Sequence, residues 1–410
     1  MNDRPQAWPA ARIALTGALL LFTTTIVIGI LNGLDVFSPN HDVLIGHVHA
    51  GTLGWITLSL SGMAMLLFTK DRVLGADELA GARRVAMGMT AAITLYVAAF
   101  YTADAIPGDR ISRPIAGTIL LLVVVWFLGW MFRSQRVVPR TVARLGLLLA
   151  FISMLIGAVF GIVLGIATSG RDIPGLSADT TNAIADAHPP AMVIGFLLLA
   201  ALAMIEWLLG DRDAAGNRAG VVQMWLVFAA GVVVNIAFVT KTDEQLLGPA
   251  NVAMIAAVIM LLVRRRADLK PSAWKGAGTG LFARMSALFL IGYLVLLTVV
   301  VVRFVSGAMD IDAMTPQDDG LLIAFDHTMF IGVMTNALFG ALAVNLHGKA
   351  TTLVDRILLW GIGVGVTGFV VGLITVEAVP KRIFTPIMGT TLLIGIAAYL
   401  METRKPATMG

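Results

Sequence analysis

The sequence predicts an all-α, polytopic membrane protein with about twelve transmembrane helices, and three observations support this fold class. Of the 410 residues, 58% are hydrophobic and only 13% are charged, whereas a soluble domain has about 25% charged residues. Apolar runs recur along the whole chain, and a membrane-spanning helix needs about 20 such residues. No linker separates these runs, so residues 1–410 are expected to form a single transmembrane domain.

Each expected helix is an apolar run between charged or turn-forming stretches. The first run is long enough to cross a bilayer, and no small-residue cleavage site follows it, so a cleavable signal is not expected. Charged clusters separate later runs, such as Arg83-Arg84 before the third and Arg264-Arg265-Arg266 after the eighth. In chain order the expected spans are 12–34, 44–69, 85–104, 114–132, 145–168, 184–209, 221–240, 246–263, 283–305, 320–346, 355–377 and 384–401.

The distribution of basic residues predicts the orientation of these spans. Of the 29 Lys and Arg residues, those expected on the side opposite the termini are only Arg110, Arg113, Arg171, Lys241, Arg303, Lys381 and Arg382. Lys and Arg are enriched in the cytoplasmic loops of membrane proteins. Both termini are therefore expected in the cytoplasm, with the chain crossing a bacterial-type inner (plasma) membrane. The net charge of +4 follows from this bias and does not indicate nucleic-acid binding.

The residue types that are missing limit the chemistry of the chain. Cysteine is absent, which excludes disulfides, iron–sulfur clusters and thiolate metal ligands. Any metal must therefore be held by His, Met or carboxylates. Phosphate-loop and zinc-protease motifs are also lacking. Glu206 and Asp211 lie at the inner end of the sixth run, and carboxylates are nearly absent from mid-membrane, so a proton-pumping relay is not expected.

Histidines lie at the beginning of three apolar runs. His47 and His49 open the second run, His188 the sixth and His327 the tenth. Even-numbered spans all run from outside to inside, so the three places share one depth in the outer half of the membrane. Buried imidazoles are costly without a partner. This convergence supports a shared site more strongly than any single histidine does.

The two histidines of the second run point to nearly opposite faces, because residues two apart on an α-helix differ by about 200°. His49 shares its face with Leu53, Ile56 and Leu60. His47 shares its face with Gly51, Gly54, Ser61 and Gly62, and Leu58 interrupts this row of small residues. A small-residue face suits a flat porphyrin below an imidazole. It also suits close packing of another helix, with His47 as a hydrogen-bonded polar group.

The other histidines have their own alternatives. His188 precedes Pro189 and Pro190, and proline is tolerated in a first helical turn, so His188 is expected to mark a helix start. A solvated cap is the ordinary alternative to a metal ligand there. His327 precedes a whole apolar span, which makes an isolated buried imidazole a weaker explanation. His41 and His347 are expected to be solvated.

The three helix starts resemble the catalytic subunit of the heme–copper oxidase superfamily, especially its nitric oxide reductase branch. His47-Val48-His49 is similar to the His-x-Asn of helix 2, with His49 at the Asn position. The stretch from His327 to Gly332 is similar to the second histidine of the family's helix 10 and the residues that follow it. The resemblance implies twelve spans with both termini inside. It also implies one low-spin heme b, with His47 and His327 as its ligands.

Basic residues near the outer membrane surface complete this expected heme site. The family places such residues between helices 11 and 12, on the heme propionates, and Lys381 and Arg382 are similar to them. Arginine binds carboxylates through a bidentate fork. Arg113 and Arg303 are further candidates. For each of these residues, snorkelling to the membrane interface is the alternative.

The sequence departs from the family at its reactive centre. Phe325 stands where the histidine of the high-spin heme would be, and 221–240 lacks the two adjacent copper ligands of helix 7. His188-Pro189 is similar to the start of helix 6, which supplies one copper ligand. A copper ion held by His188 alone would be far short of a normal ligand set. One low-spin heme b is therefore expected, and a normal copper centre is not.

These features predict a membrane b-type hemoprotein for one-electron transfer or for handling O2 or NO. An external electron donor or a small partner subunit is expected, and activity as an oxidoreductase stays open. One alternative is a non-heme transporter with a histidine-lined cavity. Another is an active oxidase or nitric oxide reductase with an atypical centre at His188, His49 and Asp186.

Overall fold

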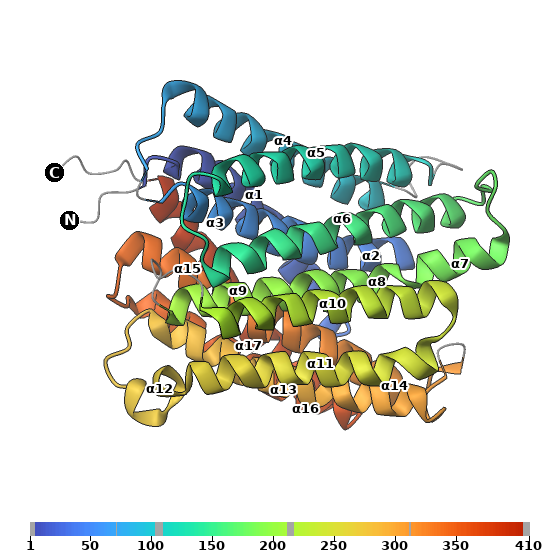
Figure 1. Cartoon of the computed structure of the whole chain (residues 1–410). Coiled ribbons are helices and arrows are strands. Elements are labelled where there is room, and N and C mark those ends of the chain that lie inside the picture. The colour runs from blue at the N-terminus through green and yellow to red at the C-terminus, as the bar shows by residue number, and fades with distance from the viewer. Residues whose placement is uncertain (1–4, 71, 103–109, 211–216, 311–312, 405–410) are drawn as a thin grey trace.

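The computed structural model describes residues 5–70, 72–102, 110–210, 217–310 and 313–404, and for Asp243 only the backbone. These residues form no strand, and the fold is 84% helix. Twelve helical units in the described part are long and apolar enough to cross a membrane, which confirms the predicted fold class and helix count. Figure 1 shows them side by side in one bundle.

Nine of the twelve units are single α-helices. A short α12 (Arg266–Leu269) and a 3-10 turn, η4 (Pro271–Ala273), lie in the connection after the eighth unit. The nine helices are α1 (Trp8–Gly33), α4 (Ala76–Tyr101), α5 (Ser112–Gln135), α6 (Val142–Thr168), α10 (Arg218–Thr240), α11 (Asp243–Arg264), α13 (Gly280–Val305), α16 (Leu353–Ile374) and α17 (Ala378–Arg404).

The second, sixth and tenth units each contain a π-helical segment, whose hydrogen bonds reach one residue further than those of an α-helix. The second consists of α2 (His41–His49), η1 (Ala50–Thr57) and α3 (Leu58–Phe68). The sixth consists of α7 (Ala178–Asp186), α8 (His188–Pro190), η3 (Ala191–Leu197) and α9 (Leu198–Leu209). The tenth consists of α14 (Pro316–His327), η6 (Thr328–Thr335) and α15 (Asn336–His347). Each π-helical segment begins one to three residues after a histidine.

These three units are central in the bundle. In their most apolar windows 78–89% of the residues are buried, compared with 33–50% in the other nine. The second and tenth units contact each other directly, because Trp55 Nε1 donates a 2.9 Å hydrogen bond to Thr335 Oγ1. Indole and hydroxyl groups are thereby paired in an apolar interior, where an unpaired donor would be costly.

Polar caps fix where the central units begin. Asn40 accepts a hydrogen bond from Val43 N at 2.9 Å, and Ser177 accepts one from Thr180 N at 3.2 Å. Thr315 and Asp318 form a reciprocal capping box. α8 begins at His188 as predicted, but His188 does not begin the sixth unit as a whole. The Ser177 cap starts the sixth unit ten residues earlier, and His188 follows a single interruption at Ala187.

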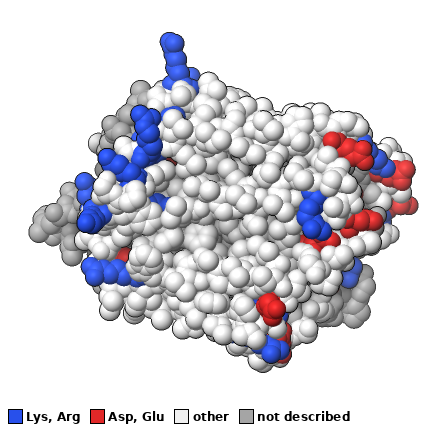
Figure 2. All heavy atoms as spheres, turned by 90° about the horizontal axis from the view of Figure 1, so that it is seen from below, with Lys and Arg blue, Asp and Glu red and all other residues white. Residues whose placement is uncertain are grey.

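The two ends of the bundle differ in charge. We call the end where α1 begins and α17 ends the terminal end, and the end where α2, α7 and α14 begin the histidine end (Figure 1). Lys and Arg side chains gather toward the terminal end on the face in Figure 2, whereas Asp and Glu side chains gather toward the histidine end, with fewer basic residues among them. This separation agrees with the predicted asymmetry.

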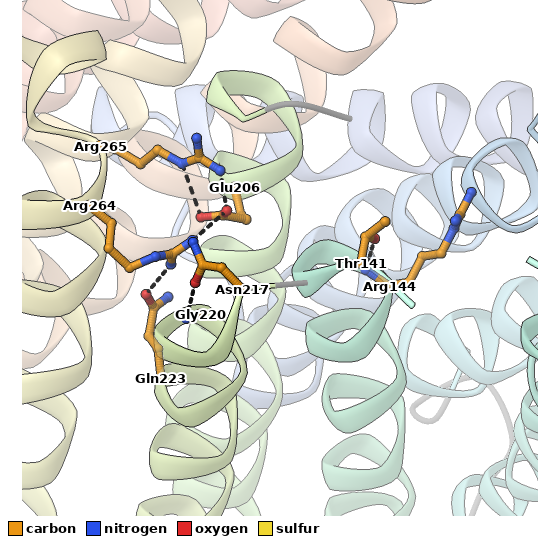
Figure 3. A network of polar contacts seen from close by, with 8 residues as sticks. All are labelled: Thr141, Arg144, Glu206, Asn217, Gly220, Gln223, Arg264 and Arg265. Carbon is orange, nitrogen blue, oxygen red and sulfur yellow. Dashed lines mark hydrogen bonds and ion pairs between the residues drawn. The ribbon is translucent and has the colours of Figure 1, made fainter. Parts of the chain in front are cut away.

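A buried ionic network ties three units together at the terminal end (Figure 3). Glu206 is 5% exposed, and its Oε1 accepts a 2.8 Å hydrogen bond from Arg264 Nη2 and a further one from Arg265. The other terminal nitrogen of Arg264 donates to Gln223 Oε1 at 2.8 Å. One carboxylate thus joins α9 to the end of α11, and Gln223 adds α10.

Candidate functional site

A cavity of about 410 Å³ lies between the second and tenth units, within the range usual for small-molecule sites. Helices α1, α16 and α17 complete its walls, so it draws residues from both ends of the sequence. Most of its lining is apolar. The polar side chains on its walls are Thr25, Asn32, His47, Asp326, His327, Thr335, Lys381 and Thr385.

His47 and His327 both line this cavity. His327 Nδ1 lies 2.9 Å from the Ile323 carbonyl oxygen, so Nδ1–H donates and Nε2 keeps its lone pair. His47 Nδ1 is buried with no hydrogen-bond partner in the described structure. Two imidazoles from units far apart in the sequence therefore line one cavity.

Small residues make room around His47. An atom placed as a Cβ on Gly29 would be 3.4 Å from His47 Cε1, so even an alanine there would be close to the ring. Gly51 lines the cavity beside Thr25, whose hydroxyl donates to the His47 carbonyl at 3.4 Å. The part of the predicted small-residue face nearest His47 therefore lies on the cavity.

The glycines further along that face fit its second interpretation, close packing of another helix. Gly54 and Gly62 pack against α1, where a Cβ would be 2.7 Å from Leu21 Cβ and 2.9 Å from Leu15 Cγ. Ile56, assigned to the face of His49, lines the cavity of His47 instead. The cause is η1, because its wider turn rotates every later residue away from the position that 100° per residue predicts.

Basic and acidic residues meet at the edge of the cavity that lies at the histidine end. Lys381 lines the cavity, and its Nζ is 3.0 Å from Asp35 Oδ1. Arg382 Nε donates to Asp35 Oδ2 at 2.8 Å, and 57% of the Arg382 side chain is exposed. These hydrogen bonds hold the pKa of Asp35 below its usual value, and the bond from Arg382 has the larger effect. Lys381 and Arg382, which were both predicted to bind heme carboxylates, therefore contact a carboxylate of the chain itself.

His49 lies outside the residues that line the cavity, and aromatic side chains of α4 surround it. Its ring stacks on Phe100 with centroids 4.5 Å apart, and the edge of Tyr96 lies at 5.3 Å. Its Nδ1 donates to the Ile45 carbonyl at 2.9 Å, the same bond four residues back that His327 makes. His49 therefore does not share a site with His47.

His188 is also outside this cavity. Its Nδ1 donates to the Gly157 carbonyl at 2.8 Å, on α6. Asp186, grouped with His188 and His49 in one sequence alternative, is exposed. Within the described residues, no group of three or more His, Cys, Asp and Glu side chains is arranged to hold a metal ion.

The other two basic candidates have acidic partners. Arg113 is 5% exposed, and its Nη2 lies 2.6 Å from Asp42 Oδ1. Arg303 Nη2 donates to Asp318 Oδ1 at 2.8 Å. Neither arginine lines the cavity. Of the four basic residues singled out from sequence, Lys381 alone does so.

Aromatic residues fill the position where the family would place a second heme ligand. Phe325 is 7% exposed and stacks on Tyr293 of α13, with ring centroids 4.7 Å apart and 22° between the planes. Phe289 packs against Gly332, where a Cβ would be 2.7 Å from the ring. This side of the tenth unit is therefore a packed aromatic interior.

Sequence reasoning missed two features. Asp326 lines the cavity next to His327, and no hydrogen bond or ion pair to its carboxylate is found in the described structure. The prediction that His347 is solvated was wrong, because its ring lies between Asp355, at 3.3 Å from Nδ1, and Glu402. The position of Asp326 beside His327 was a usable signal, whereas the partners of His347 are brought to it only by the fold.

No family model matches this sequence, and a comparison with curated proteins finds no relative.

Proposed function

We propose that this chain is a multi-pass membrane cytochrome that holds one low-spin heme b in the cavity between His47 and His327. The observation that carries the proposal is that imidazoles from the second and tenth units line one cavity. His327 presents Nε2 because its Nδ1 is hydrogen-bonded, and His47 carries a buried nitrogen without a partner. An imidazole whose other nitrogen is tied to a carbonyl is the usual form of a metal-ligating histidine.

The walls of the cavity also suit a porphyrin. Apolar side chains of five helical units would surround the macrocycle, while Gly29 and Gly51 leave space beside His47. Lys381 lies at the edge where carboxylate substituents could be bound, and Arg382 is next to it. Heme binding would require the Lys381 ammonium to exchange the Asp35 carboxylate for a heme carboxylate, or to contact both carboxylates at once.

The role that fits this arrangement is one-electron transfer. A heme with two histidine ligands cycles between ferric and ferrous iron and has no open position for a substrate. The chain would position the two imidazoles, exclude water with the apolar walls of the cavity and bind the carboxylate substituents of the heme. The basic terminal end would face the cytoplasm of a bacterial-type cell, so the cavity would lie in the outer half of the bilayer, within reach of an external electron donor.

The test is the visible spectrum of the purified protein with heme quantitation. We expect about one heme b per chain, with a low-spin spectrum, and poor binding of carbon monoxide by the reduced protein. His47→Gly and His327→Gly should each lose the low-spin signal, and added imidazole should restore it by occupying the vacated space. His49→Gly is the matched control, since it lies two residues from His47 but outside the cavity lining.

Two results would contradict the proposal. Colourless protein from heme-replete cells would show that the chain binds no heme. Rapid turnover of oxygen or nitric oxide, lost in His188→Ala, would show that a reactive centre exists and that electron transfer is not the whole function.

The second candidate is a non-heme transporter that uses the same cavity. Asp326 and Lys381 favour it, because ionisable residues facing a membrane cavity commonly mark a transport pathway. Colourless protein that takes up a small polar solute in proteoliposomes, with uptake lost in Asp326→Asn, would establish this alternative.

A further inference from the structure

A second cavity, of about 530 Å³, lies at the terminal end of the bundle and shares no residue with the cavity of His47 and His327. Its walls are the segment that follows α3, the beginning of α4 and the end of α5. Figure 1 shows α4 and α5 side by side at one edge of the bundle. We call this cavity the arginine groove, because Arg72, Arg84 and Arg133 line it.

The register of α4 and α5 brings two of these arginines to opposite walls at a similar height. A Cβ on Gly88 of α4 would lie 3.0 Å from the ring of Trp126 on α5, so these two residues stand at one level. The helices run in opposite directions. Arg84 lies four residues from this contact toward the terminal end, and Arg133 lies seven residues from it in the same direction. The two positions therefore differ by about one helical turn in height.

The charges in the arginine groove do not cancel. Three arginines and two carboxylates, those of Asp77 and Glu78, line it. Arg72 Nη2 lies 2.6 Å from Glu78 Oε1, so this pair is neutral by itself. Among the described residues, no ion pair engages Arg84, Arg133 or Asp77. The groove therefore keeps an excess of one positive charge on its two facing walls.

Two tryptophans of α5 extend the groove toward the apolar surface of the bundle. Trp126 is 40% exposed, and Trp130 stacks on Phe127 with ring centroids 5.8 Å apart. Neither indole N–H makes a hydrogen bond within the described part of the chain. Indole rings are enriched where lipid tails meet headgroups, because the ring is apolar and its N–H is a donor. Beyond them Leu122 and Val125 are 64% and 49% exposed, so α5 continues as an apolar surface.

We infer that the arginine groove binds the headgroup of one anionic glycerophospholipid of the phosphatidylglycerol class. The phosphodiester would lie between Arg84 and Arg133, since guanidinium groups bind phosphate oxygens through paired N–H donors. The headgroup hydroxyls would donate to the Asp77 carboxylate. The acyl chains would follow the apolar surface of α5 past the two tryptophans. Basic pockets between membrane-spanning helices bind anionic lipid headgroups in this way.

Both the charge and the shape of the groove favour this occupant. A phosphatidylglycerol headgroup carries one negative charge, which matches the single excess positive charge. A phosphatidylcholine headgroup has no net charge, and its trimethylammonium group has no N–H to donate to Asp77. A soluble phosphate could use the arginines, but it would gain nothing from the tryptophans and the apolar surface beside them.

The lipid site does not depend on heme at His47 and His327, so the two proposals can fail separately. A lipid bound in the arginine groove would contact α4, α5 and the segment after α3 together. A ligand that binds only the folded state stabilises it by mass action. Phosphatidylglycerol should therefore raise the melting temperature of the delipidated protein more than phosphatidylcholine does.

The experiment is a lipid titration of the full, delipidated chain in detergent, followed by native mass spectrometry. Phosphatidylglycerol and phosphatidylcholine with identical acyl chains are compared, and we expect one tightly retained phosphatidylglycerol per chain. Arg84→Gln and Arg133→Gln should each weaken its retention by about fivefold, the effect expected of one basic side chain near an anionic lipid. Arg83→Gln and Arg136→Gln are matched controls, because both arginines are exposed and lie outside the groove lining.

A steric variant tests the position of the headgroup while every arginine stays in place. Gly81 lines the groove, and a Cβ there would meet no atom within 4 Å. Gly81→Leu should therefore place its side chain in the groove without disturbing the fold, and it should abolish the preference for phosphatidylglycerol. Ala80→Leu is its matched control, because Ala80 is exposed and does not line the groove.

Folding of every variant is checked by thermal melting in lipid-free detergent. Equal retention of the two lipids by the folded wild type would overturn the inference. So would unchanged phosphatidylglycerol binding in Gly81→Leu, or an equal loss of binding in Arg83→Gln and Arg84→Gln. Displacement of the lipid by soluble glycerol phosphate would show a site for free phosphates and would equally overturn the lipid assignment.

Discussion

Replacing Glu206 by glutamine should destabilise the protein strongly, because it removes the carboxylate that pairs with both Arg264 and Arg265 in the described part of the chain. The glutamate side chain is 5% exposed, and those of the arginines are 13% and 20% exposed. Removing one partner of a buried ion pair costs about 3–5 kcal/mol. Some water reaches the arginines, so we expect about 3 kcal/mol, near the lower end of that range.

The chain offers a matched control for this change. Arg72 and Glu78 are 2.6 Å apart, but the Glu78 side chain is 50% exposed. Glu78→Gln keeps the side chain that closes the helix cap. It should therefore cost about 0–1 kcal/mol, as exposed pairs do. The substitution and the type of partner are the same in both variants, so the difference reports burial together with the second arginine that Glu206 binds.

The assay is reversible unfolding in mixed detergent micelles, followed by circular dichroism. A loss of about 3 kcal/mol changes the folding equilibrium by about two powers of ten. Glu206→Gln combined with Arg265→Gln should recover part of the loss, because the second change removes an uncompensated buried charge. Equal effects of Glu206→Gln and Glu78→Gln would refute the reasoning, as would a double variant that shows simple addition.

Three further predictions follow from the fold. A single cysteine introduced at Asp179 should react with an impermeant thiol reagent from the outside only, and one at Arg136 from the inside only, with no background because the chain has no cysteine. Reaction from the same side at both positions would contradict the crossing by α6 between them, and exchanged sides would reverse the predicted orientation. Gly54→Val should cost about 1–3 kcal/mol by overpacking, whereas Gly81→Ala, with nothing within 4 Å, should melt at or above the wild-type temperature because alanine favours the helix. Because the pKa of Asp35 is lowered in the folded protein, its contribution to stability is complete above the unfolded value, near 3.8, and is lost as the pH falls through the lower folded value. Asp35→Asn should therefore remove that acid limb and lower the melting temperature by the same small amount at pH 6 and pH 8, whereas a variant that melts like the wild type at both pH values would contradict the assignment.

The helices could be predicted from sequence, but their interruptions could not. Apolar length alone identifies a span, so twelve runs gave twelve helices. A π-helical turn changes the register by about one residue and leaves no mark in hydropathy. That is why Ile56 was assigned to the wrong face, although Ser177, a visible cap residue, could have corrected the start expected at His188.

The candidate site was predictable in part. Helical spacing separated His47 from His49 and left two roles open for His47, and a family resemblance paired it with His327. The cavity itself depends on α1, α16 and α17, whose contacts no local pattern encodes. The same holds for His347, because its partners Asp355 and Glu402 reach it only when the tenth, eleventh and twelfth units assemble.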